Sequence, residues 1–252
     1  MEALSYLVAA VFLPLFPASM LFNRMFARAG DTRLRMALLL VWPQVGVFAL
    51  ALGGSQPPAW LIGWGVLTAA LYAFRALVLR ELNMWTAHMA VSAWALLWPI
   101  ALASEDGNAL ALQGLALSVP FALLAWQAGR IEAVFGAAYA GASGGLAHAM
   151  PRLATLMTVT VLAAVGTPLF PGFFALLATI TRTAPLVPVA AIVILVVWML
   201  WAWAGARITR GFVVGPPCEE SRTDISGTVA LLAGLVLVAL GVAGVGLSGY
   251  LV

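Results

Sequence analysis

Long apolar stretches separated by short polar connections make up almost the whole of this 252-residue chain. They cover residues 3–22, 36–53, 59–79, 84–103, 108–128, 153–180, 184–206 and 227–251. Most are close to the ~20 residues that a helix needs to cross the hydrocarbon core of a bilayer. The longest connections, 129–152 and 207–226, are too short for a soluble domain. The sequence therefore predicts an all-α, polytopic integral membrane helix bundle of about eight spans, with residues 1–252 forming a single membrane domain.

The composition excludes several classes of protein. Hydrophobic residues make up 64% of the chain and charged residues 8%, whereas soluble domains have ~25% charged residues. The single cysteine, Cys218, has no internal disulfide partner, and the net charge of +3 comes from scattered arginines, so we expect no nucleic-acid partner. The chain has neither a phosphate-binding glycine loop nor metal-ligand spacing, so we predict no cofactor and no metal site.

The basic residues, all arginines, are distributed asymmetrically between alternate connections. One side has Arg24, Arg28, Arg33, Arg35, Arg80, Arg130, Arg152, Arg207, Arg210 and Arg222, and the other has only Arg182. Cytoplasmic loops are enriched in basic residues, so we expect a multi-pass protein of a bacterial-type inner membrane with both termini on the non-cytoplasmic side. The first stretch has no basic residue before it and is too long for a signal peptide, which predicts a retained span. Trp198, Trp201 and Trp203 precede Arg207 and are typical of an interfacial belt.

An interruption of the helix is expected within two of the apolar stretches. The segment 166–172 includes Gly166, Pro168, Pro171 and Gly172, which predicts one discontinuous span over residues 153–180. Broken helices in transporters commonly frame an ion or substrate site, but a simple kink packed against neighbouring helices is an equally good interpretation. A second interruption by proline is expected at residues 42–44, where it places Gln44 beside a weakened helix.

Few ionisable residues fall within the apolar stretches, and those that do are candidates for an ion path. His88 lies inside the stretch 84–103. Arg75 lies near the end of the stretch 59–79, and Glu81 lies just before the stretch 84–103, both close to the side that has most of the arginines. An imidazole, with an unperturbed pKa of ~6.5, is suited to proton exchange. A neutral histidine bonded between helices remains an alternative, because a single histidine without partners relays nothing. Arg75 is interpreted as extending towards the headgroups.

Four segments resemble the antiporter-like membrane subunits shared by respiratory complex I, Mrp-type cation/proton antiporters and inorganic-carbon accumulation complexes. Residues 144–151 contain Gly-Gly-Leu followed by Met-Pro, and residues 166–174 are similar to the family's G-x-P-x-x-S-G-F-F break. Residues 86–89 look like its S-x-S-H-M stretch, with Arg80-Glu81-Leu82 where the family has D-L-K-R. Phe16-Pro17 and residues 44–48 are similar to its earlier broken helix.

The departures from that resemblance concern charge. The buried lysine of proton-conducting members aligns with Gln44, and the Lys or Glu after the second break aligns with Leu176. The family's histidine before Gly-Gly-Leu falls on Leu117 or Ala122. Neither glutamine nor leucine exchanges protons as a buried lysine does. The resemblance implies a degenerate member of the family, because the charged positions are lost. It also implies a truncated member, because the chain is shorter than a full-length subunit.

Together these patterns predict an accessory or structural membrane subunit of a multi-subunit proton- or cation-coupled complex, with its own proton path lost. Its expected partners are other membrane subunits, including a full-length antiporter-like homologue, and the lipid bilayer. A transporter subunit with a reduced pathway through Gln44, Glu81 and His88, coupled to electron transfer, cation antiport or bicarbonate uptake, is the main alternative. A membrane-embedded enzyme is a weaker alternative, because the chain has no cluster of catalytic side chains.

Overall fold

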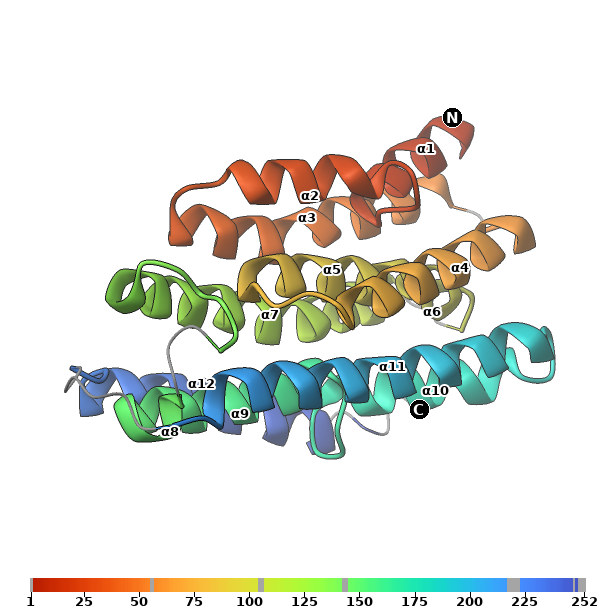
Figure 1. Ribbon diagram of the computed structural model, residues 1–252. Helices are drawn as coiled ribbons and strands as arrows, with labels where there is room; N and C mark the ends of the chain where they lie inside the picture. The colour runs from red at the N-terminus through yellow and green to blue at the C-terminus, as the bar shows by residue number, and fades with distance from the viewer. Residues whose placement is uncertain are drawn as a thin grey trace.

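The computed structural model describes residues 2–54, 57–103, 107–141, 145–216, 223–246 and 248. Its helices are α1 (Glu2–Phe12), α2 (Ser19–Arg28), α3 (Thr32–Gly53), α4 (Ala59–Ala76), α5 (Leu82–Ala95), α6 (Leu97–Ala103), α7 (Gly107–Phe135), α8 (Leu146–Ala149), α9 (Pro151–Ala164), α10 (Pro171–Thr183), α11 (Pro188–Val213) and α12 (Gly227–Gly246). The long helices run side by side along one axis, with α5 in the middle (Figure 1). Within the described residues the only β-type pairing is an isolated bridge between Glu81 and Tyr139. The expected all-α class is confirmed.

Five helices, α3, α4, α7, α11 and α12, are long and apolar enough to cross a membrane by length and composition. The shorter helices α1 and α9 are also apolar. These helices make the chain a multi-pass membrane protein, while the full count of about eight spans stays a prediction.

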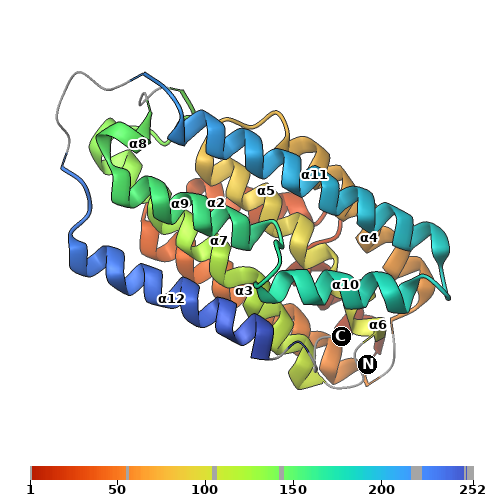
Figure 2. The same cartoon turned by 90° about the horizontal axis from the view of Figure 1, so that it is seen from below.

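The expected interruption near 166–172 is present. Helix α9 ends at Ala164 and α10 begins at Pro171, so residues 165–170 are the break. Gly166 adopts a φ of 69°, in the left-handed region that glycine tolerates best. Pro171 begins α10 at a position where a missing N–H costs nothing. The two half-helices lie nearly end to end (Figure 2).

The interruption expected at residues 42–44 is wrong. Helix α3 continues through Pro43 to Gly53. A proline inside a helix removes one backbone hydrogen bond, but here the surrounding chain holds the helix in place: Pro43 is buried, and Gly46 lies directly against Leu13. The apolar stretch 3–22 is divided instead, because α1 ends at Phe12 and α2 begins at Ser19. Pro14 and Pro17 lie in that break.

Most of the described arginines gather at one end of the bundle, which we call the arginine-rich end. Arg35 forms an ion pair with Glu132 at 3.0 Å, which ties α3 to α7. Leu82 N–H bonds to the Ala138 carbonyl, and Gly141 N–H bonds to the Gly211 carbonyl. These contacts bring the α4–α5 connection, the end of α7 and the end of α11 together. Arg182 lies in the last turn of α10, away from this end.

Candidate functional site

The first break, residues 13–18, is held by tryptophan side chains from three other helices. The indole N–H groups of Trp42, Trp64 and Trp98 donate to the carbonyls of Val11, Phe16 and Leu13, at 3.3, 2.6 and 3.0 Å. Thr68 Oγ1 accepts from the Phe16 N–H at 3.2 Å. A broken helix leaves backbone groups that need partners where no water is available. Here neighbouring side chains supply partners, so an ion is not needed to satisfy these three carbonyls.

His88 lies at the centre of the bundle with 5% of its surface exposed. Its Nδ1 is 2.8 Å from the Met84 carbonyl one turn earlier on α5. A carbonyl oxygen only accepts, so this bond places a proton on Nδ1. The ring packs against Tyr72, with centroids 5.2 Å apart, and the Tyr72 hydroxyl bonds to Ser19 Oγ at 2.9 Å. His88 therefore has a structural role that accounts for its burial.

Arg75 contacts the same aromatic ring. Its guanidinium carbon lies 5.9 Å from the centroid of the Tyr72 ring, within the range of a cation–π contact. His88 and Arg75 thus both contact the ring of Tyr72. Of the four candidates Gln44, Arg75, Glu81 and His88, the structure brings only Arg75 and His88 together in this way.

Glu81 is the N-cap of α5. Its carboxylate accepts hydrogen bonds from the N–H groups of Asn83 and Met84, at 2.9 and 2.6 Å. This is the geometry by which an acidic side chain satisfies the free donors at a helix N-terminus. Glu81 precedes His88 by seven residues, which is ~10 Å along a helix axis. Because each of its two oxygens accepts one of these hydrogen bonds, the whole carboxylate is engaged at the helix end.

Gln44 lies on α3 facing α7. A Cβ at Gly114 would be 3.2 Å from Gln44 Nε2, so the absence of a side chain there leaves room for the amide. Within the described residues this buried nitrogen has no hydrogen-bond partner. The position that the family resemblance assigns to a lysine therefore holds a neutral amide packed against a helix.

At the second break, leucine side chains fill the space beside two glycines, and an indole donates to two backbone carbonyls. Leu176, the other position at which the resemblance implies a charge, is 1% exposed and approaches Gly166, where an added Cβ would be 3.0 Å from its Cδ1. Leu117 approaches Gly172 in the same way, at 3.4 Å. Trp198 Nε1 donates to the carbonyls of Val165 and Gly166 at 3.1 and 3.2 Å.

The belt interpretation is wrong for two of the three tryptophans on α11. Trp198 bonds to the break, and Trp201 is fully buried with its indole donating to Ser92 Oγ at 2.8 Å. Trp203 is 63% exposed. Residues three apart on a helix share a face. The spacing of Trp198 and Trp201 therefore indicates that both lie on one face of the helix, but it does not reveal their hydrogen-bond partners.

The described residues contain no group of three His, Cys, Asp or Glu side chains close enough to hold a metal ion. The geometry is that of two helix breaks at which backbone carbonyls are bonded to indoles.

Comparison with protein-family models gives no match, and comparison with curated proteins gives none either. Among solved structures, the chain is similar to a chain of respiratory complex I from Thermus thermophilus, with a TM-score of 0.86 and 24% identity. It is also similar to a chain of the Mrp complex from a Dietzia species, with a TM-score of 0.85 and 19% identity. A chain of an archaeal membrane-bound sulfane sulfur reductase gives 0.79 and 19%. The protein has the fold of these chains of membrane complexes.

These similarities cover 96–99% of this chain but only 52–57% of the other three. The protein thus spans a little more than half the length of each of these chains. At such low identity the comparison shows the fold alone.

Proposed function

We propose that this protein is an accessory or structural membrane subunit of a multi-subunit proton- or cation-coupled complex, and that its own proton path is lost. The antiporter-like fold, seen here in chains of two respiratory complexes and an Mrp complex, supports membership in such an assembly. The main support for a lost proton path is the second break, where Leu176 and Leu117 occupy the space beside Gly166 and Gly172.

The chemistry of that break supports a dry, structural role. A proton relay needs groups that take up and release protons, and neither leucine nor an indole N–H does so under ordinary conditions. Glu81 is committed to a helix end, and Gln44 has no ionisable group. This leaves His88 as the histidine at the centre of the described bundle, with Nδ1 already bonded to the backbone.

The proposed topology has eight spans in a bacterial-type inner membrane. Three pairs of consecutive short helices, α1 with α2, α5 with α6 and α9 with α10, each supply one crossing beside the five long helices. The grouping of arginines at one end supports placing that end in the cytoplasm, with both termini on the other side.

The partners that we propose are other membrane subunits, including a full-length antiporter-like homologue that bears the missing charges. Large apolar side chains on the outer faces of α4 and α11, such as Phe74, Ile192 and Met199, are exposed and available for lipid or helix contacts. Close packing against another subunit is one way to cover them.

A reduced pathway through His88 is the second candidate function. It is favoured by the position of Tyr72, whose ring packs against the imidazole and whose hydroxyl bonds to Ser19 Oγ beside the first break. In this alternative Glu81 or Gln44 extends the route through water.

The deciding experiment begins with purification of the tagged protein from its native membrane in mild detergent, with copurifying proteins identified by mass spectrometry. The recovered complex is reconstituted into vesicles, and proton flux is followed with a pH-sensitive dye. Glutamine keeps a donor for the Met84 carbonyl but cannot exchange protons. If the role of His88 is structural, His88→Gln should leave the proton flux unchanged. Loss of flux in an intact His88→Gln complex would favour the reduced pathway. Transport by this protein alone, as a homo-oligomer, would also overturn the accessory role.

A further inference from the structure

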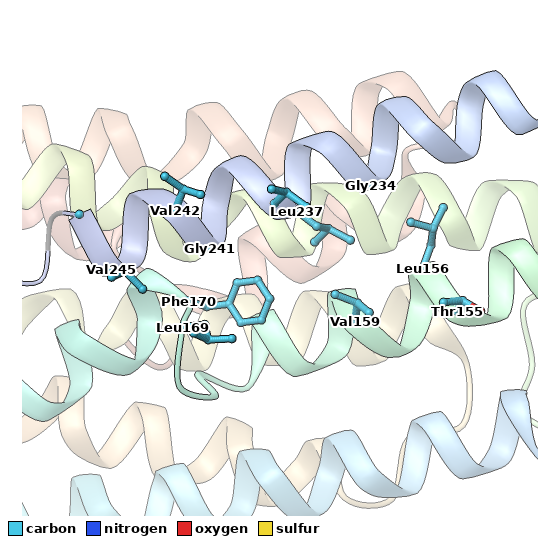
Figure 3. Close-up of a pocket in the computed structure, with 12 residues that line it drawn as sticks. Thr155, Leu156, Val159, Leu169, Phe170, Gly234, Leu237, Gly241, Val242 and Val245 are labelled. Carbon is cyan, nitrogen blue, oxygen red and sulfur yellow. The ribbon is translucent and has the colours of Figure 1, made fainter.

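An apolar groove of about 750 Å³ lies between α9 and α12 on the outside of the bundle. Its walls include Leu156 and Val159 of α9, Leu237 and Val242 of α12, and Phe170 of the second break (Figure 3). Gly234 and Gly241 open the groove on the α12 side, because a Cβ at either position would have no neighbour within 4 Å. Helix α12 has only two buried residues in its whole length, Leu237 and Gly244.

A positive charge stands beyond the end of the groove that faces the arginine-rich end. Arg152 belongs to the first turn of α9 and precedes the groove residue Thr155 by three positions, so the two share a helix face. Its guanidinium donates to the Ile225 carbonyl at 3.1 Å, just before α12 begins. Arg152 is otherwise exposed, and its guanidinium has further N–H donors.

Asp224, which lies beside Arg152 in the described part of the chain, is already engaged. Asp224 accepts from the backbone N–H groups of Arg152 and Leu153, at 2.7 and 3.4 Å. Its charge is thus directed at the N-terminus of α9, where the helix dipole stabilises an anion. The arginine side chain remains the group that a second anion at this end of the groove would meet.

The length of the groove distinguishes between two classes of occupant. The lining residues of α12 run from Gly234 to Gly246, which corresponds to ~18 Å of helix. A transmembrane helix needs the full ~30 Å of the hydrocarbon core, whereas one leaflet supplies about half of it. The groove therefore matches an acyl chain that enters from one leaflet better than a spanning helix.

We propose that a phospholipid of the leaflet at the arginine-rich end binds here. One acyl chain lies in the groove between α9 and α12, and the phosphate pairs with the Arg152 guanidinium beside the Thr155 hydroxyl. Planar guanidinium groups bind phosphate oxygens through paired, charge-assisted hydrogen bonds. The bound chain fills the space beside the second break, next to the direct contact that α12 makes with the break at Gly244.

The test uses the purified full chain in phosphatidylethanolamine vesicles that contain a little phosphatidylglycerol with a photoactivatable diazirine on one acyl chain. After illumination, labelled peptides are located by mass spectrometry. We expect labelling concentrated on residues 155–170 and 234–246 compared with the exposed face of α4. Gly241→Leu places a side chain in the open groove and is expected to abolish that excess, whereas Gly63→Leu, at an equally open position on α4, is expected to leave it unchanged.

A second pair of variants tests the phosphate contact without filling the groove. We expect Arg152→Gln to reduce groove labelling about three- to tenfold, the effect of losing one exposed charge-assisted contact, and Arg152→Lys to restore much of it. Arg28→Gln, at an exposed arginine in the last turn of α2, is the matched control and should have no effect. Labelling spread evenly over all exposed helices, or a copurifying polypeptide crosslinked within the groove, would overturn the proposal.

Discussion

Three of the acidic side chains in the described part of the chain hold helix ends. Asp31 accepts from the Arg33 N–H at the start of α3, and Glu81 and Asp224 do the same for α5 and α9. A negative charge at a helix N-terminus satisfies free donors and interacts favourably with the helix dipole. At the scale of single residues, a carboxylate near the membrane is thus not by itself a sign of proton transfer.

Replacement of Glu81 separates capping from proton exchange. Glu81→Ala removes the cap of α5 and should cost about 1 kcal/mol, which lowers the Tm by about 2–4 °C in a chain of this size. Glu81→Asn retains a good cap and cannot titrate, so we expect both the Tm and the proton flux of the reconstituted complex to stay at the wild-type level. A stable Glu81→Asn protein without flux would show that Glu81 carries protons.

Leu176 tests whether the second break is dry. Leu176→Lys places an ammonium among buried apolar groups without a carboxylate partner, and we expect a loss of about 3 kcal/mol or more in thermal unfolding in detergent. Leu176→Met, which preserves volume and polarity, is the control and should cost less than about 1.5 kcal/mol. A Leu176→Lys protein of normal stability would mean that water reaches the break.

At the scale of elements, each helix break is stabilised by indoles from other helices. The interruption between α9 and α10 exposes the carbonyls of Val165 and Gly166, and Trp198 of α11 donates to both. Its ring also packs edge-on against Phe173, with centroids 5.4 Å apart. The break is therefore a fixed part of the bundle and not a frayed helix end.

Trp198→Phe removes the donor while keeping most of the ring. Leaving buried carbonyls unpaired should cost about 1–3 kcal/mol, which a comparison of thermal unfolding midpoints would detect. Trp203→Phe, on the exposed face of the same helix, should change stability by no more than about 0.5 kcal/mol. Equal effects of the two substitutions would argue against the role given to the Trp198 N–H.

At the scale of the whole molecule, α12 is the least buried of the five long apolar helices. It packs on α9 and α10, and its closest approach is at Gly244, whose Cβ position overlaps the carbonyl of Leu169 and the backbone of Phe170 and Pro171. The absence of a side chain at this position lets α12 lie directly on the second break.

Gly244→Ala should displace α12 from the break. Overpacking of this kind costs about 1–3 kcal/mol, and we expect faster hydrogen exchange across residues 227–246, measured by mass spectrometry. Gly241→Ala adds the same methyl group towards open space and is the matched control, with exchange close to that of the wild type. Unchanged exchange in Gly244→Ala would show that α12 is held elsewhere.

The membrane class, the helical content and the second break follow from the sequence because they depend on local properties. An apolar run of ~20 residues needs a bilayer, and the glycines and prolines of residues 166–172 act on the backbone wherever the segment lies. The burial of His88 within an apolar stretch has the same local origin.

Only the tertiary structure decided which prolines interrupt a helix and what each polar group does. Pro43 lies inside a continuous helix, while the segment with Pro14 and Pro17 divides α1 from α2. Carbonyls of that break and of the last turn of α1 bond to indoles 31, 48 and 85 residues away in the chain. The stability of a broken helix in a bilayer depends on whether its free backbone groups find partners, and those partners come from helices that only the folded bundle brings together.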